Sequence, residues 1–567
     1  MASGYLSVVL HAHLPFVRHP EHEEFLEEDW LYEAITETYI PLLWMMEGLA
    51  EDDVDFRLTM SLTPSLVSML DDDFLRGRYA RHLDMLCELS EKEVERTRHA
   101  PEFHDTARMY RDRFLKARRD YRDRWKMNLV AAFARLERRG SVEILTSAAT
   151  HGFLPVLKVN PLAVRAQIFI GAQHTAETFG LRPAGIWLPE CGFYPGLDEV
   201  LRKIGIRYFF TDTHAIDNAA GRARYGVYAP LYCPSGVAAF GRDPESSKQV
   251  WSATEGYPGD VDYREFYRDI GYDLDLEYIR PYIHKDGIRI NTGFKYYRVT
   301  GRTDLKEPYV CSRALGKAAE HADNFVFHRE SQMKWLQGWM DRKPIVIAPY
   351  DAELFGHWWF EGPDWLGSLL RRIAGNGSGL RLITPSEYLE EHPVNQVETP
   401  SASSWGYKGY NEMWLNGTND WLYRHVHAAA DRMVELADEH PAAVGVMLRA
   451  LNQAARELLL AQASDWAFIM TRGTVVEYAE RRTKEHLLRF TQLYEMVKKK
   501  SVHATWLAAV EAKDNLFSNL DYRVYRSDYE FSWKGGLPND EARPNSRNRR
   551  RSAQHQRLGK RRRSRDP

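Results

Sequence analysis

Short apolar runs recur through residues 1–390, and helix-compatible stretches such as Pro161–Thr178 and Gly196–Ile204 separate most of them. Runs of this length are typical of buried strands, and their alternation with helices predicts a parallel α/β fold. Polar residues follow soon after several runs, which is typical of a TIM-like barrel, here with about seven or eight strands. The predicted strands are Tyr5–Leu10, Phe56–Leu62, Val142–Thr146, Gly185–Leu188, Tyr208–Thr211, Ile288–Thr292, Ile345–Ala348 and Leu380–Thr384.

Two further segments differ from this alternation. Residues 71–140 are highly charged with apolar residues at helical spacing, which predicts a helical insertion with a solvated charged face between the second and third strands. After Pro400 the pattern becomes helical over residues 417–436, 441–464 and 474–500. The predicted organisation is therefore a catalytic barrel (1–395, with the insertion at about 71–140), an α-helical C-terminal domain (396–534) and a basic disordered tail (535–567).

Charge and cysteine usage narrow the class of protein. Residues 543–567 carry eleven Arg or Lys and one acid, which gives this segment a net charge of +10. Because the whole chain has a net charge of −3, the rest of the chain carries −13. An acidic body does not favour nucleic-acid binding. No apolar run reaches the roughly 18 residues of a membrane span, and the N-terminus lacks the features of a signal peptide. The four cysteines are widely spaced without a CxxC pattern, which favours a reducing, cytoplasmic setting.

Two carboxylates lie in unusual aromatic surroundings. Glu190 stands in Gly-Ile-Trp-Leu-Pro-Glu-Cys-Gly-Phe, and Asp351 precedes Ala-Glu-Leu-Phe-Gly-His-Trp-Trp-Phe, each just after an apolar run. Paired acids among rings are typical of glycoside chemistry, in which one acid protonates the leaving oxygen, the other meets the sugar carbon, and rings stack on sugar faces. We expect a nucleophile at Glu190 and an acid/base at Asp351, whose pKa the rings of Tyr350, Trp358 and Trp359 should raise. An ion pair at the barrel mouth is the structural alternative for either acid.

Several histidines and one further acid accompany this pair. His11 and His13 form an HxH pair at a strand end, and alternation puts both side chains on one face. Three interpretations stay open: contacts to sugar hydroxyls, core histidines, or a metal pair completed by His151 or by Asp212 and His214. Asp465 is either a helix cap or a sugar contact. Glu353, His357 and Asp212 are equally compatible with structural hydrogen bonding.

Rings and amides are dense between Ser404 and Trp421. Because Gly, Asn and Asp surround these rings, we interpret the segment as a loop surface in which Trp405 and Trp414 bind glycan. Trp421 starts a helix and is expected to be buried. Residues 236–273 contain Gly, Pro, Asp and Ser with little periodicity, and long loops of this kind often build sites on barrels.

Five segments together resemble the five sequence regions of glycoside hydrolase family 57, and most closely its 1,4-α-glucan branching enzyme group. They are His11-Ala-His-Leu-Pro, His151-Gly-Phe-Leu-Pro, Trp187-Leu-Pro-Glu-Cys-Gly-Phe, the stretch from Tyr350 to Gly362, and the stretch from Trp405 to Trp421. The resemblance extends to about residue 530. It implies a (β/α)7 barrel, a helical insertion, a helical C-terminal domain and a retaining mechanism without metal or organic cofactor.

The resemblance also implies residue roles. Glu190 corresponds to the nucleophile and Asp351 to the acid/base. The substrate-binding residues implied or expected are His11, His13, His151, Trp30, Trp251, Trp358, Trp405, Trp414 and Asp465. The segment from Tyr232 to Trp251 resembles the mobile loop of such enzymes.

The expected function is that of a 1,4-α-glucan branching enzyme acting on amylose or glycogen in the cytoplasm. An α-amylase-type hydrolase or a 4-α-glucanotransferase on the same scaffold is the first alternative. A metal-dependent carbohydrate deacetylase and a non-catalytic glycogen-binding protein are further ones. The sequence leaves the oligomeric state open between monomer and dimer.

Overall fold

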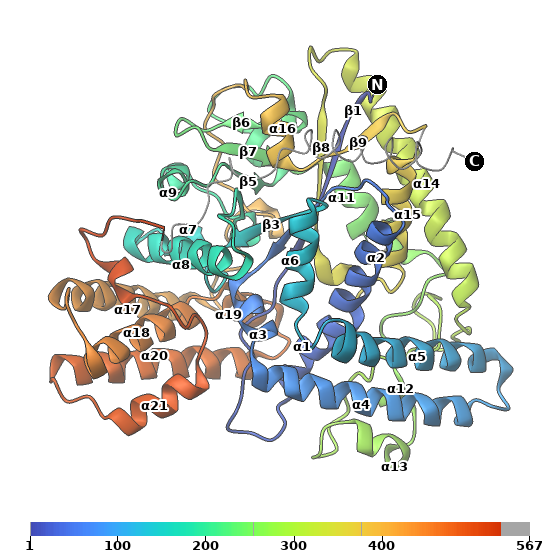
Figure 1. The fold of residues 1–567 in the computed structure, drawn as a ribbon, viewed down its shortest axis with the longest axis horizontal. Coiled ribbons are helices and arrows are strands. Elements are labelled where there is room, and N and C mark those ends of the chain that lie inside the picture. The colour runs from blue at the N-terminus through green and yellow to red at the C-terminus, as the bar shows by residue number, and fades with distance from the viewer. Residues whose placement is uncertain (1, 253–254, 376, 534–567) are drawn as a thin grey trace, which may run out of the picture.

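Seven parallel strands form the centre of the molecule. The computed structural model describes residues 2–252, 255–375 and 377–533. The parallel strands follow the spatial order β7-β5-β4-β3-β2-β1-β8, and Figure 1 shows helices on the outside of them. They are β1 (Gly4–Ala12), β2 (Leu58–Leu62), β3 (Val142–Ser147), β4 (Gly185–Trp187), β5 (Tyr208–Thr211), β7 (Ala238–Gly241) and β8 (Ile345–Asp351).

The two ends of this sheet meet, which closes a TIM-like (β/α)7 barrel. The backbone N–H of Asp243, just after β7, donates to the carbonyl of Ile347 in β8 at 3.0 Å. Two short strands lie outside the ring: β9 (Leu380–Leu382) pairs with the start of β1, and β6 (Leu231–Tyr232) runs antiparallel to β7. The fold class predicted from the sequence is confirmed.

One predicted strand is wrong, and one strand of the barrel was missed. Residues 288–292 form no strand, since Ile288 is half exposed and the Thr292 hydroxyl donates to Asp269 in a loop. The missing barrel strand is β7, which lies inside the segment interpreted as a long loop. That segment also holds the helix α11 (Pro244–Trp251). A four-residue strand with two alanines carries too little apolar signal to be distinguished from a loop by periodicity.

Helices connect the strands and cover the barrel. Between β2 and β3 the chain forms α4 (Asp73–Arg96), α5 (Pro101–Arg119), the π-helical turn η3 (Asp120–Arg124) and α6 (Leu129–Arg139), where the sequence predicts the helical insertion. The other α-helices of more than four described residues up to residue 391 are α1 (Asp29–Glu33), α2 (Ile40–Glu51), α3 (Pro64–Leu70), α8 (Pro161–Phe179), α9 (Leu197–Lys203), α10 (Thr213–Asp217), α14 (Cys311–Gln337), α15 (Gly362–Ala374) and α16 (Pro385–Glu391), and the π-helix η2 (Ala34–Tyr39) joins α1 to α2.

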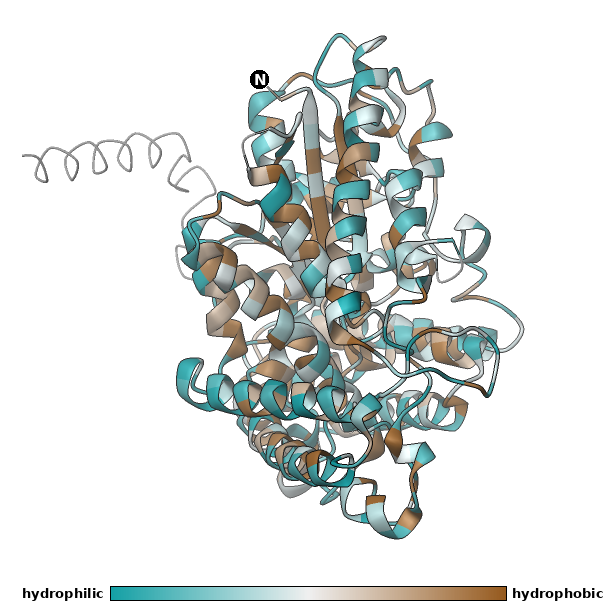
Figure 2. Ribbon diagram, turned by 90° about the vertical axis from the view of Figure 1, so that its right-hand side faces the viewer, coloured by the Kyte–Doolittle hydropathy of each residue, from teal (hydrophilic) through white to brown (hydrophobic). Residues whose placement is uncertain are grey.

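In the described residues after 400, five α-helices pack against the barrel at the lower left of Figure 1. They are α17 (Asp420–Glu439), α18 (Gly445–Ala461), α19 (Ser464–Arg472), α20 (Val476–Lys498) and α21 (Ala504–Lys513). Barrel strands and these helices contribute to one continuous hydrophobic cluster, for example Leu10 and Ile186 with Leu458 and Phe490. In Figure 2 the helices carry both hydrophilic and hydrophobic residues along their length. Burial of a shared apolar face therefore fixes the C-terminal helices against the barrel.

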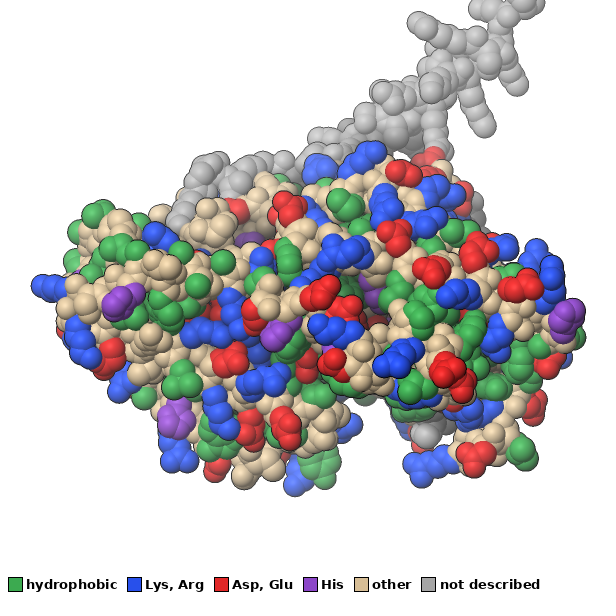
Figure 3. Space-filling view, turned by 90° about the horizontal axis from the view of Figure 1, so that it is seen from below, with side chains coloured by type: hydrophobic (Ala, Val, Ile, Leu, Met, Phe, Trp, Pro, Cys, Tyr) green, Lys and Arg blue, Asp and Glu red, His purple; other side chains and the backbone are tan. Residues whose placement is uncertain are grey.

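Two surface features bear on possible partners: helices that could span a membrane, and the distribution of charge on one face. Among the described residues no helix is long and apolar enough to cross a membrane. Figure 3 shows the face that lies at the bottom of Figure 1, where Lys and Arg alternate with Asp and Glu over the coloured part. The predicted basic tail (535–567) lies outside the described residues.

Candidate active site

A cleft of about 650 Å³ opens at the carboxyl ends of the barrel strands. Strands β1, β4 and β8 deliver His11, Glu190 and Asp351 to it, because each residue stands at or just after a strand end. The segment after residue 400 closes the other side with Trp405 and Asp465. The eleven residues to which the sequence assigns a catalytic or substrate-binding role all line this one cleft: Glu190, Asp351, His11, His13, His151, Trp30, Trp251, Trp358, Trp405, Trp414 and Asp465.

Glu190 lies in a tight turn held by two donors. Its backbone is left-handed (φ 59°), which is unusual for a residue with a side chain and strained. The Trp405 indole N–H donates to Oε2 at 2.8 Å, and the Ser464 hydroxyl donates to Oε1 at 3.3 Å. Burial raises the pKa of Glu190 to about 7, although these two hydrogen bonds work in the opposite direction. The carboxylate form is thus stabilised locally within an otherwise desolvating site.

Asp351 ends β8 beside His11 of β1, which is its register partner. Burial, followed by the charges of Glu353 and Glu190, raises the pKa of Asp351 well above its usual range. Within the described part of the chain no side chain donates a hydrogen bond to this carboxyl. Glu190 accepts two such bonds and Asp351 accepts none, so hydrogen bonding stabilises the ionised form of Glu190 but not that of Asp351. A pair of acids separated in this way suits one group to attack and the other to protonate.

Three histidines stack beside the carboxyls. The rings of His13 and His151 lie 3.8 Å apart, and His11 Nε2 lies 3.0 Å from His151 Nε2. Burial lowers the pKa values of His11 and His151 well below the usual range, so both rings are neutral. Burial acts to lower the pKa of His13, but the carboxylates of Asp465, Glu190 and Glu353 together outweigh it and raise this pKa above its ordinary value. The site therefore combines two neutral imidazoles with one that favours the charged form.

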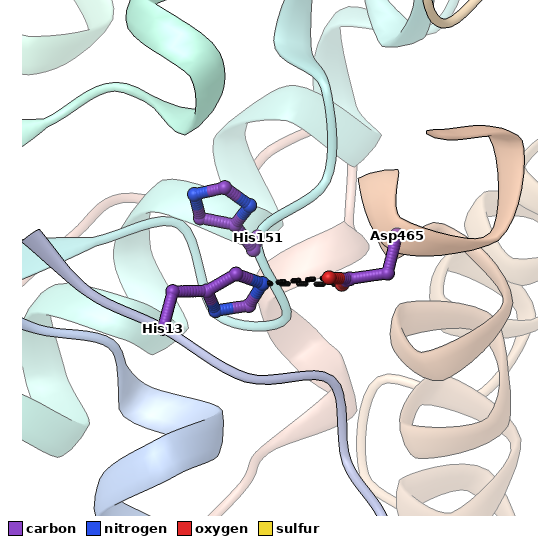
Figure 4. Close-up of side chains that lie close together, drawn as sticks. All are labelled: His13, His151 and Asp465. Carbon is purple, nitrogen blue, oxygen red and sulfur yellow. Dashed lines mark hydrogen bonds and ion pairs between the residues drawn. The ribbon is translucent and has the colours of Figure 1, made fainter. Parts of the chain in front are cut away.

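Asp465 joins this group from the helical C-terminal region. Both of its oxygens lie within 3.1 Å of His13 Nε2, as the dashed lines in Figure 4 show. The helix-cap interpretation is wrong, since the side chain points across the cleft to His13 instead of to the backbone N–H groups of α19. Any contact to a sugar hydroxyl would come from this cross-cleft position.

The distances between His13, His151 and Asp465 would allow a metal ion, but the chemistry of the group favours hydrogen bonding. His13 uses both ring nitrogens on Thr63 and Asp465, and His151 uses both of its own on His11 and Ser464. The alternative metal set with Asp212 and His214 does not assemble. Asp212 pairs with Arg242 at 2.8 Å, and His214 bonds to the carbonyl of Gly409.

The aromatic residues divide into exposed and buried ones. Trp358 is 52% exposed and its ring stacks on Phe266 with 4.2 Å between centroids, which leaves one face open. Trp251 meets Trp405 edge to face at 6.0 Å. Trp414 is only 1% exposed and stacks on Phe153, so the interpretation of this ring as part of a loop surface is wrong. It supports the wall of the cleft from behind.

The residues in or beside the cleft that sequence reasoning missed include three polar side chains: Arg242, Glu33 and Ser464. Arg242 follows the unrecognised strand β7, and its charge lowers the pKa of Asp351. Glu33, the last residue of α1, lines the cleft, and Ser464 contacts Glu190. Of these residues, only Ser464 could have been suspected from the sequence, because it adjoins the candidate Asp465 beside a predicted helix.

A parallel barrel with two buried carboxyls in a ring-lined cleft at its strand ends defines the class of carbohydrate-processing barrels. The chain belongs to glycoside hydrolase family 57, because residues 7–401 match the sequence model described as glycosyl hydrolase family 57. Residues 425–525 match the model described as 1,4-alpha-glucan branching enzyme, C-terminal.

Three relatives cover nearly the whole chain. A 1,4-alpha-glucan branching enzyme from Thermococcus kodakarensis is 34% identical over 93% of this chain and 79% of its own length. The crystal structure of a GH57-type branching enzyme from Pyrococcus horikoshii is 34% identical, covers 94% of this chain and 100% of its own, and has a TM-score of 0.84. The crystal structure of the α-amylase AmyC from Thermotoga maritima is 46% identical, covers 93% and 99%, and has a TM-score of 0.87.

Proposed function

We propose that this chain is a 1,4-α-glucan branching enzyme that breaks α-1,4 bonds and transfers the released chain to a 6-hydroxyl. One observation carries the proposal: the region that matches the branching-enzyme C-terminal model reaches into the cleft and places Asp465 against His13. The similarity to branching enzymes thus includes groups beside the two carboxyls, along with the barrel itself.

In the first step Glu190 attacks C1 of an internal glucose while Asp351 gives its proton to the leaving O4. The C1–O4 bond breaks, and a glycosyl ester forms between C1 and the Glu190 carboxylate. For this direct displacement we expect the two carboxyl groups to stand about 5–5.5 Å apart once glucan is bound. The raised pKa of Asp351 favours the protonated form that a general acid needs. The hydrogen bonds to Glu190 favour the ionised form that a nucleophile needs.

In the second step an acceptor glucan replaces the leaving chain. Asp351, now ionised, takes the proton of the acceptor 6-hydroxyl, the C1–O6 bond forms, and the ester bond to Glu190 breaks. Two inversions at C1 give net retention. The acceptor must outcompete water, and a well-held reactant reaches effective molarities of roughly 10⁵ M or more. The open face of Trp358 and the edge-to-face pair Trp251–Trp405 are the proposed holding surfaces.

Hydrolysis on the same scaffold is the alternative that a specific observation favours. The Thermotoga maritima structure described as an α-amylase has the higher identity, 46% against 34% for the Pyrococcus horikoshii branching enzyme. Both reactions share the glycosyl ester at Glu190 and differ only in whether water or a 6-hydroxyl resolves it. The distinction is therefore a matter of acceptor binding.

Proton NMR of the products from amylose separates these outcomes. We expect new α-1,6 anomeric signals that greatly outnumber new reducing ends, because each transfer moves a chain without adding water. A matched sample incubated with the Glu190→Gln variant controls for contaminating activity. Reducing ends that rise one for one with the loss of α-1,4 signal would instead establish a hydrolase, and new chain lengths without α-1,6 signals a 4-α-glucanotransferase.

The organisation and setting follow as parts of the same proposal. We propose a catalytic barrel over 1–395, a C-terminal helical unit over 396–534 that completes the cleft, and a role in glycogen synthesis in the cytoplasm. All four cysteines are free thiols, three of them buried, which suits a reducing compartment. Fractionation of the native cells, with the protein outside the cytoplasmic fraction, would refute the proposed location.

A further inference from the structure

We propose that Ser464 is a positioning residue for Glu190: its hydroxyl, held by His151, fixes one carboxylate oxygen in the orientation that attack on C1 requires. The inference rests on the proposed function in so far as Glu190 is the nucleophile. Ser464 begins α19, so the group that orients the barrel carboxylate comes from the C-terminal helices.

The backbone around the carboxylate shows why such a contact is needed. Glu190 and His151 both adopt left-handed conformations, with φ values of 59° and 57°. Residues with side chains adopt this region at a cost of order 1–3 kcal/mol each and keep it only where the surroundings enforce it. The N–H of Trp405 donates to the Glu190 carbonyl at 3.0 Å, and the N–H of Ser464 donates to the His151 carbonyl at 3.1 Å. The segment after residue 400 therefore holds both strained turns.

The side chains form a chain of hydrogen bonds with only one consistent arrangement of protons. The Ser464 hydroxyl donates to Glu190 Oε1 at 3.3 Å, so its oxygen accepts from His151 Nδ1–H at 2.9 Å. Since His151 is neutral, its Nε2 carries a lone pair and accepts from His11 Nε2–H at 3.0 Å. His11 Nδ1 ends the chain as a buried atom without a partner. Each hydrogen bond in this chain is therefore donated in the direction of the Glu190 carboxylate.

The supports of Ser464 are rigid and independent of its hydroxyl. Gly152 and Ala463 form an isolated β-bridge next to the Ser464–His151 contact. The Gln167 amide donates to Thr150 Oγ1 and to Gln462 Oε1, both at 2.9 Å. Loss of the hydroxyl alone leaves these contacts and the Ser464 N–H in place. A change at Glu190 can therefore be measured without dismantling the junction.

The variant Ser464→Ala tests the proposal against Ser464→Thr, which keeps a hydroxyl. With amylose as substrate and the loss of α-1,4 signal as the rate, we expect Ala to lower kcat on the order of 10–100-fold with little change in KM, since misplacement by about 1 Å costs this much. Thr should recover most of the rate. Ser90→Ala, which removes a buried hydroxyl bonded to the Cys87 carbonyl in α4, is the matched control and should leave kcat unchanged.

The pH dependence of kcat/KM separates a positioning role of Ser464 from a structural one, because loss of a structural contact alone would not shift the acid limb. The charged and titratable groups around Glu190 are His13, His151, Asp351 and Asp465, and all of them remain in the variant. The Ser464 hydroxyl donates to the ionised carboxylate and so lowers its pKa; its loss raises this pKa. The acid limb of kcat/KM should therefore move to higher pH in Ser464→Ala and return in Ser464→Thr.

Two results would overturn the proposal. One is a Ser464→Ala enzyme with unchanged kcat and acid limb. The other is a slow Ala variant whose acid limb stays in place and whose defect Thr does not repair, which assigns Ser464 a structural role only. The rate counts broken α-1,4 bonds, so it reads the same whether the enzyme branches or hydrolyses. Failure of the branching proposal would thus appear in the product NMR and leave this test intact.

Discussion

Replacing Glu190 by Ala is expected to lower the turnover of amylose on the order of 10⁴-fold or more, because the variant lacks the carboxylate that forms the proposed ester with C1. Glucan binding should survive, since the rings and histidines that line the cleft remain. Affinity electrophoresis in an amylose gel measures binding. Glu190→Gln, which keeps the size of the side chain, checks that the loss comes from the carboxylate and not from a cavity.

Azide reveals the role of the lost group through the geometry of its product. With α-maltosyl fluoride and azide, Glu190→Ala should form β-maltosyl azide, because the small anion enters the space left by the carboxylate and inverts C1 once. Glu199→Ala, an exposed acid on α9, is the control and should behave as the native enzyme. An α-azide product, or turnover of amylose within tenfold of native, would show that Glu190 is not the nucleophile.

Replacing Asp351 by Ala is expected to produce the complementary pattern. Turnover of amylose should fall roughly 10²–10⁴-fold, the usual contribution of a general acid. Formation of the glycosyl ester from α-maltosyl fluoride should fall far less, since fluoride leaves without a proton. Azide should then speed the second step and give α-maltosyl azide, because Glu190 still inverts C1 first. Rates with both substrates and the anomeric coupling of the product are the measurements.

The control for this variant is Asp73→Ala, an acid on α4 whose side chain is 98% exposed. It should leave both rates and the product unchanged. An equal loss on amylose and on the fluoride would contradict the assignment of proton transfer to Asp351. Formation of the β-azide by Asp351→Ala would reverse the roles of the two carboxyls.

Patterns local to the sequence predicted most of the barrel. Seven of the eight predicted strands overlap observed ones, because each holds several large apolar residues that the strand buries. The strand β7 was not predicted, because its two alanines add little to the apolar pattern that marks a buried strand. The predicted strand at 288–292 failed because apolar residues there alternate with polar ones on an exposed loop, where Ile288 stays half exposed.

The sequence predicted those site residues whose chemistry and position after a strand both indicated a role. Glu190 and Asp351 follow apolar runs and adjoin rings, and the barrel brings strand ends together without further information. Ser464 was not readable, because its contact with Glu190 depends on how the C-terminal helices pack on the barrel. The left-handed positions at Glu190 and His151 are not glycines, and hydrogen bonds from the distant residues Trp405 and Ser464 help to hold them. The burial of Trp414 likewise depends on its contact with Phe153.

The account depends on a covalent bond between C1 of the sugar and the carboxylate of Glu190, formed opposite Asp351 in one cleft. Incubation with a 5-fluoro-α-glycosyl fluoride slows the second step and allows the ester to accumulate for proteolysis and peptide mass spectrometry. We predict one glycosyl group per chain, on the peptide that contains Glu190. A label on the peptide of Asp351 or Glu353, or full inactivation without any label, would contradict the account.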